Sequence, residues 1–219
     1  MQFKNRSEAG RLLSNRLLAY AHHPNVVVLA LPPGGAPVAF EVARALNAPM
    51  DVFMVRKLAV PSCEGLIFGA IATGGARVLN DVVQYFHIPQ SVVQLVTARE
   101  QQELERCERA CRGDRTEPEL KGKTVILVDD GLASSSTLRA AVIALRSRRP
   151  ATIVVAAPVS TAETCDELRD EVDQFVSVLK PVPFGVERWY EELPEISDED
   201  VRSLLERAAH EQIEPSVVS

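Results

Sequence analysis

Short runs of apolar residues alternate with stretches of helical spacing along most of the chain. Residues 26–31 read VVVLAL and residues 124–128 read TVILV. This β-branched composition is typical of strands that are buried on both faces of a parallel sheet. Similar runs predict strands at residues 51–55, 152–157 and 174–179. We therefore expect a sheet whose strands lie mostly in the interior of the molecule.

The segments between these runs have the spacing of amphipathic helices. Ser7 is predicted to cap a first helix whose apolar face is made of leucines up to Leu18. A long helix is expected over residues 89–112, with Glu and Arg alternating on its exposed face. Further helices are predicted at residues 36–46, 137–148 and 162–171.

This alternation of strands and helices predicts an α/β fold, with helices on both faces of a parallel sheet and right-handed crossovers. Ligands of such sheets bind beyond the carboxyl ends of the strands. The rule selects three loops, at residues 32–35, 56–65 and 129–137. Residues 181–219 are richer in Pro and Glu, so we expect them to form a small hood with a helical extension on a core of residues 1–180.

Composition narrows the class of protein. The 219 residues are 46% hydrophobic, and 24 Lys and Arg stand against 30 Asp and Glu, which gives a net charge of −6. A chain of this kind can bury a globular core. Its acidity argues against nucleic-acid binding, which depends on basic side chains. No apolar stretch has the length of a membrane span, and residues 1–16 carry charges where a signal peptide is apolar, so we expect a cytoplasmic protein.

The strongest chemical signal is the string DDGLASSST that follows TVILV. Two adjacent carboxylates, Asp129 and Asp130, stand at the predicted carboxyl end of a buried strand. There they can accept hydrogen bonds from the diol of a sugar. The small residues that follow can wrap a phosphate with backbone N–H groups, hydroxyls and a helix N-terminus. The alternative is a plain turn whose serines only cap the next helix.

The same string resembles the signature by which type I phosphoribosyltransferases bind 5-phosphoribosyl 1-diphosphate (PRPP). In that signature an apolar strand precedes two acidic residues, a few small or apolar residues and Thr-Gly-x-Thr. Residues 125–130 and Thr137 match it, and Ser134 keeps a hydroxyl. Residues 29–46, 51–61 and 69–80, and the charged helix after Pro89, also resemble blocks of a subgroup of predicted bacterial phosphoribosyltransferases.

The resemblance implies a parallel-sheet core with a variable hood, and transfer of the phosphoribosyl group from PRPP to a nitrogenous base with release of pyrophosphate. It implies Mg2+ as cofactor, held mainly by PRPP and at most partly by Asp129 and Asp130, the residues expected to be catalytic and to bind the ribose. The residues implied for the 5-phosphate are Gly131, Ala133, Ser134, Ser135, Ser136 and Thr137. Those implied for the pyrophosphate are Pro33, Gly34, Gly35, Arg56 and Lys57.

Three positions depart from the family pattern. Pro33 stands where the related sequences usually carry Arg, which removes a cation and an N–H group. Ser135 replaces a Gly, and Ala133 replaces the acidic residue that 6-oxopurine enzymes carry. These departures keep a second hypothesis open, a divergent PRPP-binding or regulatory protein without catalysis. A third is another activity on phosphorylated sugars.

The acceptor base is not predicted by any pattern in the chain. Phe184, Trp189 and Tyr190 are candidates to stack on a base, or they serve packing alone. The charged helices at residues 89–112 and 197–210 are candidates for a homodimer contact, although a solvated face explains their charges equally well.

Overall fold

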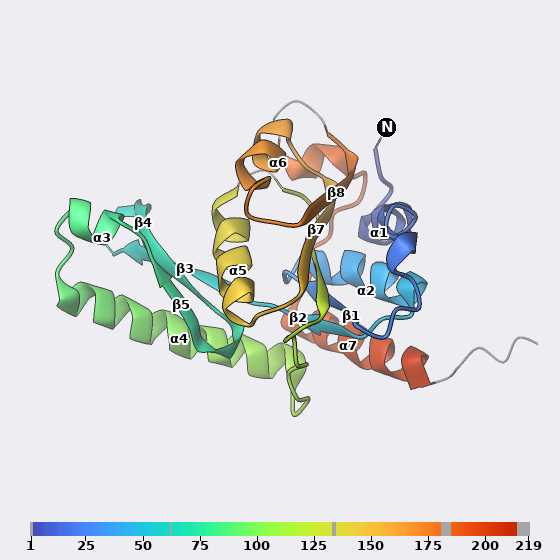
Figure 1. Cartoon of the computed structure of the whole chain (residues 1–219), viewed down its shortest axis with the longest axis horizontal. Helices are drawn as coiled ribbons and strands as arrows, with labels where there is room; N and C mark the ends of the chain where they lie inside the picture. The colour runs from blue at the N-terminus through green and yellow to red at the C-terminus, as the bar shows by residue number, and fades with distance from the viewer. Residues whose placement is uncertain (1, 62, 133–134, 181–184, 214–219) are drawn as a thin grey trace, which may run out of the picture.

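The computed structural model of the chain describes residues 2–61, 63–132, 135–180 and 185–213, except for the side chains of 64, 135, 136, 212 and 213. Figure 1 shows a sheet core with an arm that extends to one side.

A five-stranded parallel sheet forms the core, in the order β2-β1-β6-β7-β8. Its central strands are paired in register, so that Val27 lies beside Val125 and Val125 beside Ile153. The buried runs therefore form the parallel sheet that their composition predicts. The strands are β1 (Val26–Ala30), β2 (Met50–Val52), β6 (Thr124–Val128), β7 (Thr152–Val159) and β8 (Gln174–Leu179).

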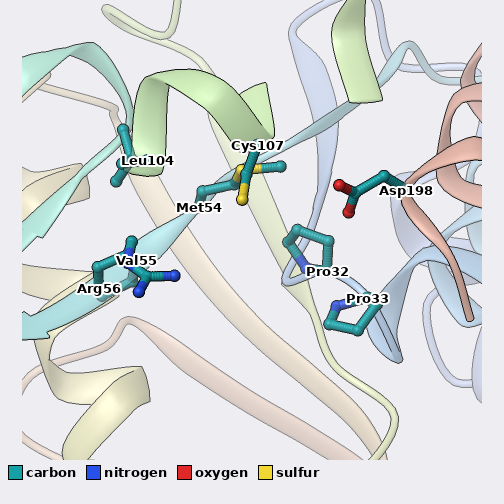
Figure 2. A pocket seen from close by; sticks show the side chains of 8 residues that line it. All are labelled: Pro32, Pro33, Met54, Val55, Arg56, Leu104, Cys107 and Asp198. Atoms are coloured by element: carbon teal, nitrogen blue, oxygen red, sulfur yellow. The ribbon is translucent and has the colours of Figure 1, made fainter. Parts of the chain in front are cut away.

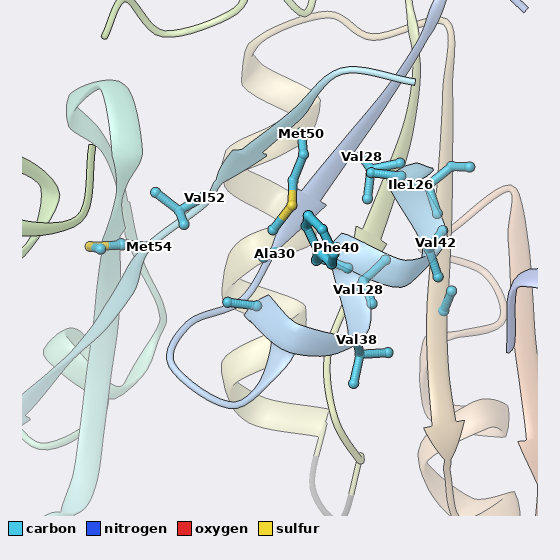
Figure 3. Packing of buried hydrophobic residues seen from close by; sticks show 14 of the residues in the cluster. Val28, Ala30, Val38, Phe40, Val42, Met50, Val52, Met54, Ile126 and Val128 are labelled. Carbon is cyan, nitrogen blue, oxygen red and sulfur yellow. The ribbon is translucent and has the colours of Figure 1, made fainter. Parts of the chain in front are cut away.

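Helices cover both faces of this sheet, and alternate residues of each strand belong to different hydrophobic clusters. Val28 and Ile126 pack with Phe40 of α2 (Gly35–Leu46), as Figure 3 shows. Val27 and Val125 instead share a cluster with Leu138 of α5 (Ser135–Ser147). This division is the one expected of strands that are buried on both faces. The remaining helix of the α5 layer is α6 (Ala162–Leu168).

The arm is a three-stranded antiparallel sheet of β3 (Val55–Val60), β4 (Cys63–Ala72) and β5 (Ala76–Leu79). The short helix α3 (Val82–Tyr85) and the long helix α4 (Gln90–Arg112) complete it (Figure 1). The prediction for α4 is confirmed within one residue. The prediction of a strand at residues 51–55 followed by a loop at 56–65 is wrong, because β2 ends at Val52 and residues 55–60 pair with β4.

The N-terminal helix differs from the sequence prediction at both ends. Helix α1 (Arg6–Ser14) is capped by Asn5, whose side chain accepts from the Glu8 N–H at 3.0 Å, and not by Ser7. Beyond it, Leu17 is buried, but Leu18 lies in the short 3-10 helix η1 (Leu18–Tyr20) and is 54% exposed. The leucine pattern therefore spans two elements rather than one helix.

The C-terminal helix packs back onto the core. Helix α7 (Asp198–Ile213) contacts α2 and α4, and it buries Val201 and Leu205 in the same cluster as Phe40. A single turn, η3 (Val186–Trp189), precedes it. The division between a core and a hood at residue 180 stays a prediction. Within the described residues, no helix is both long and apolar enough to cross a membrane.

Candidate functional site

The carboxyl end of β6 carries the two acids that the sequence singled out. Asp129 accepts a hydrogen bond from the backbone N–H of Asp130 through Oδ1, at 2.9 Å. The Oδ2 atom of Asp130 accepts from Nε of Arg6 at 2.9 Å. Tyr190 donates its hydroxyl proton to the backbone oxygen of Asp130 at 2.6 Å. Both acids are half-buried, so they are fixed in position and still accessible to a ligand.

The surroundings of Asp129 favour its protonated form. Burial, and then the nearby negative charge of Asp130, raises the pKa of Asp129 to about 8. Arg6 acts in the opposite direction, and its guanidinium is paired with Asp130 itself. At neutral pH Asp129 is therefore largely protonated.

The loop after β1 lies directly against these acids. It contains a cis peptide bond between Pro32 and Pro33, followed by Gly34 and Gly35. A Cβ atom on Gly34 would lie 2.2 Å from Oδ2 of Asp130, and one on Gly35 would lie 2.6 Å from the backbone oxygen of Val128. Gly34 has ordinary helical dihedral angles. Both glycines are therefore needed for close packing against β6, and not for an unusual backbone conformation.

The loop between β6 and α5 is described only in part. Ala133 and Ser134 lie outside the described residues, as do the side chains of Ser135 and Ser136. Helix α5 begins at Ser135, two residues before its predicted start, so its N-terminus lies close to the two acids along the chain. Thr137 is half-buried in the first turn. A Cβ atom on Gly131 would lie 2.5 Å from Cγ1 of Val186, so this glycine allows η3 to pack against the loop.

A cavity of about 160 Å3 lies on the arm side of the Pro32–Pro33 turn (Figure 2). It brings together two residues predicted to face the pyrophosphate, Pro33 of the loop and Arg56 of β3. Its other lining residues are Pro32, Met54, Val55, Leu104, Cys107 and Asp198. The sequence pattern missed the last three, because they come from distant parts of the chain.

Of the two predicted cations, Arg56 lines this cavity and Lys57 is not among the lining residues. Nε of Arg56 lies 2.6 Å from Oε2 of Glu100, and the other oxygen of Glu100 lies 2.7 Å from Arg99. Although burial opposes ionisation, the hydrogen bonds from both arginines hold the pKa of Glu100 below its usual value. The Arg56 charge is thus already paired. Lys57 is half-buried on β3 and has no ion-pair partner among the residues that the structure describes.

The aromatic residues proposed to stack on a base have different surroundings. Phe184 lies outside the described residues. Tyr190 is buried against Phe3, with 5.6 Å between ring centroids. Its hydroxyl bonds to Asp130, so its ring belongs to the packing around the acids. Trp189 is half-buried, and its Nε1 atom has no hydrogen-bond partner among the described residues.

The chemical capacity of the site follows from these groups. It presents carboxylate oxygens for hydroxyl groups and a helix N-terminus for an anion. Among the described residues, no three His, Cys, Asp or Glu side chains come together as a metal site. A divalent ion at Asp129 and Asp130 would therefore need oxygens from a bound ligand to complete its coordination, as Mg2+ commonly does.

Comparison with known proteins identifies the family. The model of the phosphoribosyl transferase domain matches residues 65–189. Two curated relatives from Mycobacterium tuberculosis, strains H37Rv and CDC 1551, carry the name "Putative phosphoribosyl transferase" and are 38% identical over 218 residues. The match covers 99% of this chain and 49% of the relative, so the chain spans about half the length of these relatives.

A solved structure has the same fold. The protein TT1426 from Thermus thermophilus superimposes with a TM-score of 0.83 at 35% sequence identity, over 94% of this chain and 98% of TT1426. The α/β architecture and the acids at the end of β6 are those that the sequence resemblance implied. The chain belongs to the phosphoribosyl transferase domain family.

Proposed function

We propose that this protein binds PRPP and transfers its phosphoribosyl group to a nitrogenous base, releasing pyrophosphate. One observation carries the proposal. Asp129 and Asp130 stand together at the end of the central strand β6, close to the N-terminus of α5 and in contact with the glycine loop after β1. This arrangement supplies acceptors for a diol and donors for a phosphate within one short segment.

In this proposal the ribose and its 5-phosphate bind on opposite sides of the β6–α5 loop. The hydroxyls of the ribose donate hydrogen bonds to the carboxyl groups, and the 5-phosphate binds at the N-terminus of α5. Free backbone N–H groups and the helix dipole both favour an anion there. The diphosphate then extends toward the Pro33 loop and the cavity that Arg56 lines.

Transfer breaks the bond between C1 of the ribose and the diphosphate oxygen, and forms a bond between C1 and a nitrogen of the base. The bonding electron pair leaves with the diphosphate, and the proton on the attacking nitrogen is lost to solvent or to a neighbouring base. Positive charge develops on the ribose in the transition state, so the nearby carboxylates stabilise it electrostatically. Mg2+ is expected to arrive with PRPP and to neutralise the departing diphosphate.

The second candidate is a protein that binds PRPP without catalysis. It is favoured by the shortage of free positive charge on the diphosphate side, where Pro33 has no N–H group and Arg56 is paired with Glu100. An enzyme needs charge there in the transition state, whereas binding of the sugar phosphate depends mainly on the β6–α5 segment.

The test is an assay of pyrophosphate release from Mg-PRPP with a panel of purine and pyrimidine bases. We expect one class of base to stimulate release, and the Asp129→Asn/Asp130→Asn variant to abolish it. Binding of PRPP without release for any base would support the second candidate. Failure to bind PRPP at all would overturn both.

The partners, cellular location and oligomeric state of the protein are predicted from the sequence alone. The negative net charge of −6 argues against a nucleic-acid partner. A cytoplasmic location can be checked by fractionation. Self-association can be checked by light scattering, which would give about twice the 24.0 kDa of the chain for a homodimer.

A further inference from the structure

A salt bridge joins the first helix of the chain to one of the two acids. Nε of Arg6, the first residue of α1, lies 2.9 Å from Oδ2 of Asp130, which is 124 residues away in the sequence. The two side chains are only 12% and 17% exposed. The sequence resemblance assigns no role to Arg6. Yet it is the cation held directly on a residue predicted to bind the ribose.

The surroundings of Arg6 hold it in a defined place. Its Nη1 atom donates to the backbone oxygen of Pro194 at 2.6 Å. The N-terminal residues beside it pair with the segment after η3. The N–H of Phe3 donates to the oxygen of Trp189 at 2.8 Å, and the N–H of Glu191 donates to the oxygen of Phe3 at 2.9 Å. The N-terminal segment, the C-terminal segment and the end of β6 are therefore one hydrogen-bonded unit.

This unit determines how the Asp130 carboxylate is presented. Arg6 donates a hydrogen bond to Oδ2, and Tyr190 donates one to the backbone oxygen. Gly34 has no side chain, which leaves room for the carboxylate against the loop. The Oδ1 atom has no hydrogen-bond donor among the residues that the structure describes. One carboxylate oxygen thus fixes the group, and the other keeps its capacity to accept a hydrogen bond.

A mainly stabilising role does not explain this arrangement well. A buried ion pair gains little net stability over an apolar pair of similar volume, because both charges lose their hydration. It does impose a direction, since the planar guanidinium donates along fixed lines. Here that direction orients a carboxylate at the end of the central strand.

We propose that Arg6 is a positioning residue for the sugar, which holds the Asp130 carboxylate so that its Oδ1 atom accepts a hydrogen bond from the ribose diol. The proposal rests on the function proposed above and adds to it a residue from the N-terminal helix. It also makes ribose recognition depend on the pairing of the N-terminal and C-terminal segments.

The test compares Arg6→Gln with Arg11→Gln, a matched control on the same helix. Arg11 is 57% exposed and lies 3.4 Å from Glu41, away from Asp130. Calorimetric titration with ribose 5-phosphate and with Mg-PRPP measures both affinities. We expect Arg6→Gln to weaken both ligands by about tenfold, the scale of one hydrogen bond to a charged group. Arg11→Gln should bind like the wild type.

A double-mutant cycle separates positioning from general loosening of the structure. If Arg6 acts through Asp130, Arg6→Gln should weaken binding in the wild type but have no further effect in an Asp130→Asn background. The preference for ribose 5-phosphate over 2-deoxyribose 5-phosphate should also fall in Arg6→Gln. Equal losses in both backgrounds, with the preference for ribose retained, would overturn the proposal and leave a structural role.

Two further outcomes keep the two proposals apart. If the wild type binds PRPP and Arg6→Gln binds equally well, the inference about Arg6 is wrong and the proposed function stands. If the wild type binds neither ligand, both proposals fall. Should Arg6→Gln not fold, Arg6→Lys keeps the charge but cannot hold Asp130 and Pro194 together in the same way, and intermediate affinity is then expected.

Discussion

The two halves of the candidate site are built in different ways. On the ribose side, Asp130 is fixed by Arg6 and Tyr190 and packs against Gly34 with no room for a methyl group. On the diphosphate side, the cavity is lined mostly by apolar groups, its arginine is paired with Glu100, and Asp198 adds a negative charge at its edge. The first half is closely packed and hydrogen-bonded, while the second has little free positive charge among the residues described.

In the proposed function, this difference would separate recognition of the sugar from stabilisation of the leaving diphosphate. Close packing of backbone and carboxylates can recognise a diol without help from mobile groups. A departing diphosphate needs positive charge to stabilise it, and in the proposed function we expect this charge from Mg2+ bound with PRPP or from a rearrangement of Arg56. Affinity for the phosphoribosyl group and catalytic rate should therefore respond to different substitutions.

The largest effect is expected from Asp129→Asn/Asp130→Asn. Both carboxyl groups become amides and the ion pair with Arg6 is lost, so the hydrogen bonds from the ribose weaken and affinity for Mg-PRPP should fall by about 100-fold or more. Calorimetry measures the change, and Asp166→Asn is the control, because that acid pairs with Arg169 on the exposed surface of α6. Wild-type affinity in the double variant would show that the diol binds elsewhere.

Gly34→Ala should weaken the ribose side next. The added methyl would lie 2.2 Å from Oδ2 of Asp130, so the carboxylate or the loop must move. We expect a loss of about 1–3 kcal/mol in the free energy of unfolding, together with weaker PRPP binding. Chemical denaturation gives the first quantity. Gly65→Ala is the matched control for stability, since a methyl there meets nothing within 4 Å. Equal stability of both variants would contradict the close packing.

The pH dependence of the free energy of unfolding tests whether Asp129 is protonated in the folded protein. Burial and the charge of Asp130 raise the pKa of Asp129 to about 8 in the folded protein, against about 3.9 in the unfolded chain. The folded state therefore favours the protonated form, and this contribution is full below pH about 4 and is lost as the pH rises to about 8.

The unfolding temperature of the wild type should accordingly fall, relative to that of Asp129→Asn, between these two pH values. Binding of PRPP should also release protons in this range if the diol requires an ionised Asp129. A constant difference in unfolding temperature between the two proteins would show that Asp129 titrates normally.

The smallest effect is expected on the diphosphate side, from Glu100→Gln. Removing this charge frees Arg56, so Mg-PRPP should bind about threefold more tightly at low salt, while ribose 5-phosphate should bind as before. Glu206→Gln, at an exposed pair on α7, serves as the control. Unchanged affinity for Mg-PRPP would show that Arg56 does not reach the diphosphate.

The sequence predicted the buried parts of the fold well and the half-buried parts poorly. Strand β8 has the predicted bounds, and α4 begins one residue later than expected. In both elements the spacing of apolar residues follows from which side chains are buried, so it can be read from the sequence. Strand β3 read as a loop because its side chains are mostly half-buried and Pro61 follows it, and its pairing with β4 depends on tertiary contacts. The cap of α1 is Asn5 and not Ser7, because the side chain of Asn5 accepts the Glu8 N–H. The leucine pattern carries no information about this hydrogen bond.

The same limit applies to the site. The sequence placed Asp129 and Asp130 at the end of a central strand, because an apolar run leads directly into them. It assigned Gly34 and Gly35 to phosphate contact, which stays a prediction, and it did not indicate their close packing against β6. Arg6 could not be found from spacing, since 124 residues separate it from Asp130 and only the folded chain brings them together.

The account depends most directly on recognition of the phosphoribosyl group by the ribose side. The decisive measurement is the unfolding temperature of the wild type with Mg2+ and saturating PRPP, compared with Mg2+ and pyrophosphate alone. A ligand at about 100 times its Kd stabilises the folded state by about 2.7 kcal/mol, which corresponds to about 5–10 °C for a chain of this size. We expect that rise with PRPP and little change with pyrophosphate. No rise with PRPP, or an equal rise with pyrophosphate, would contradict the account.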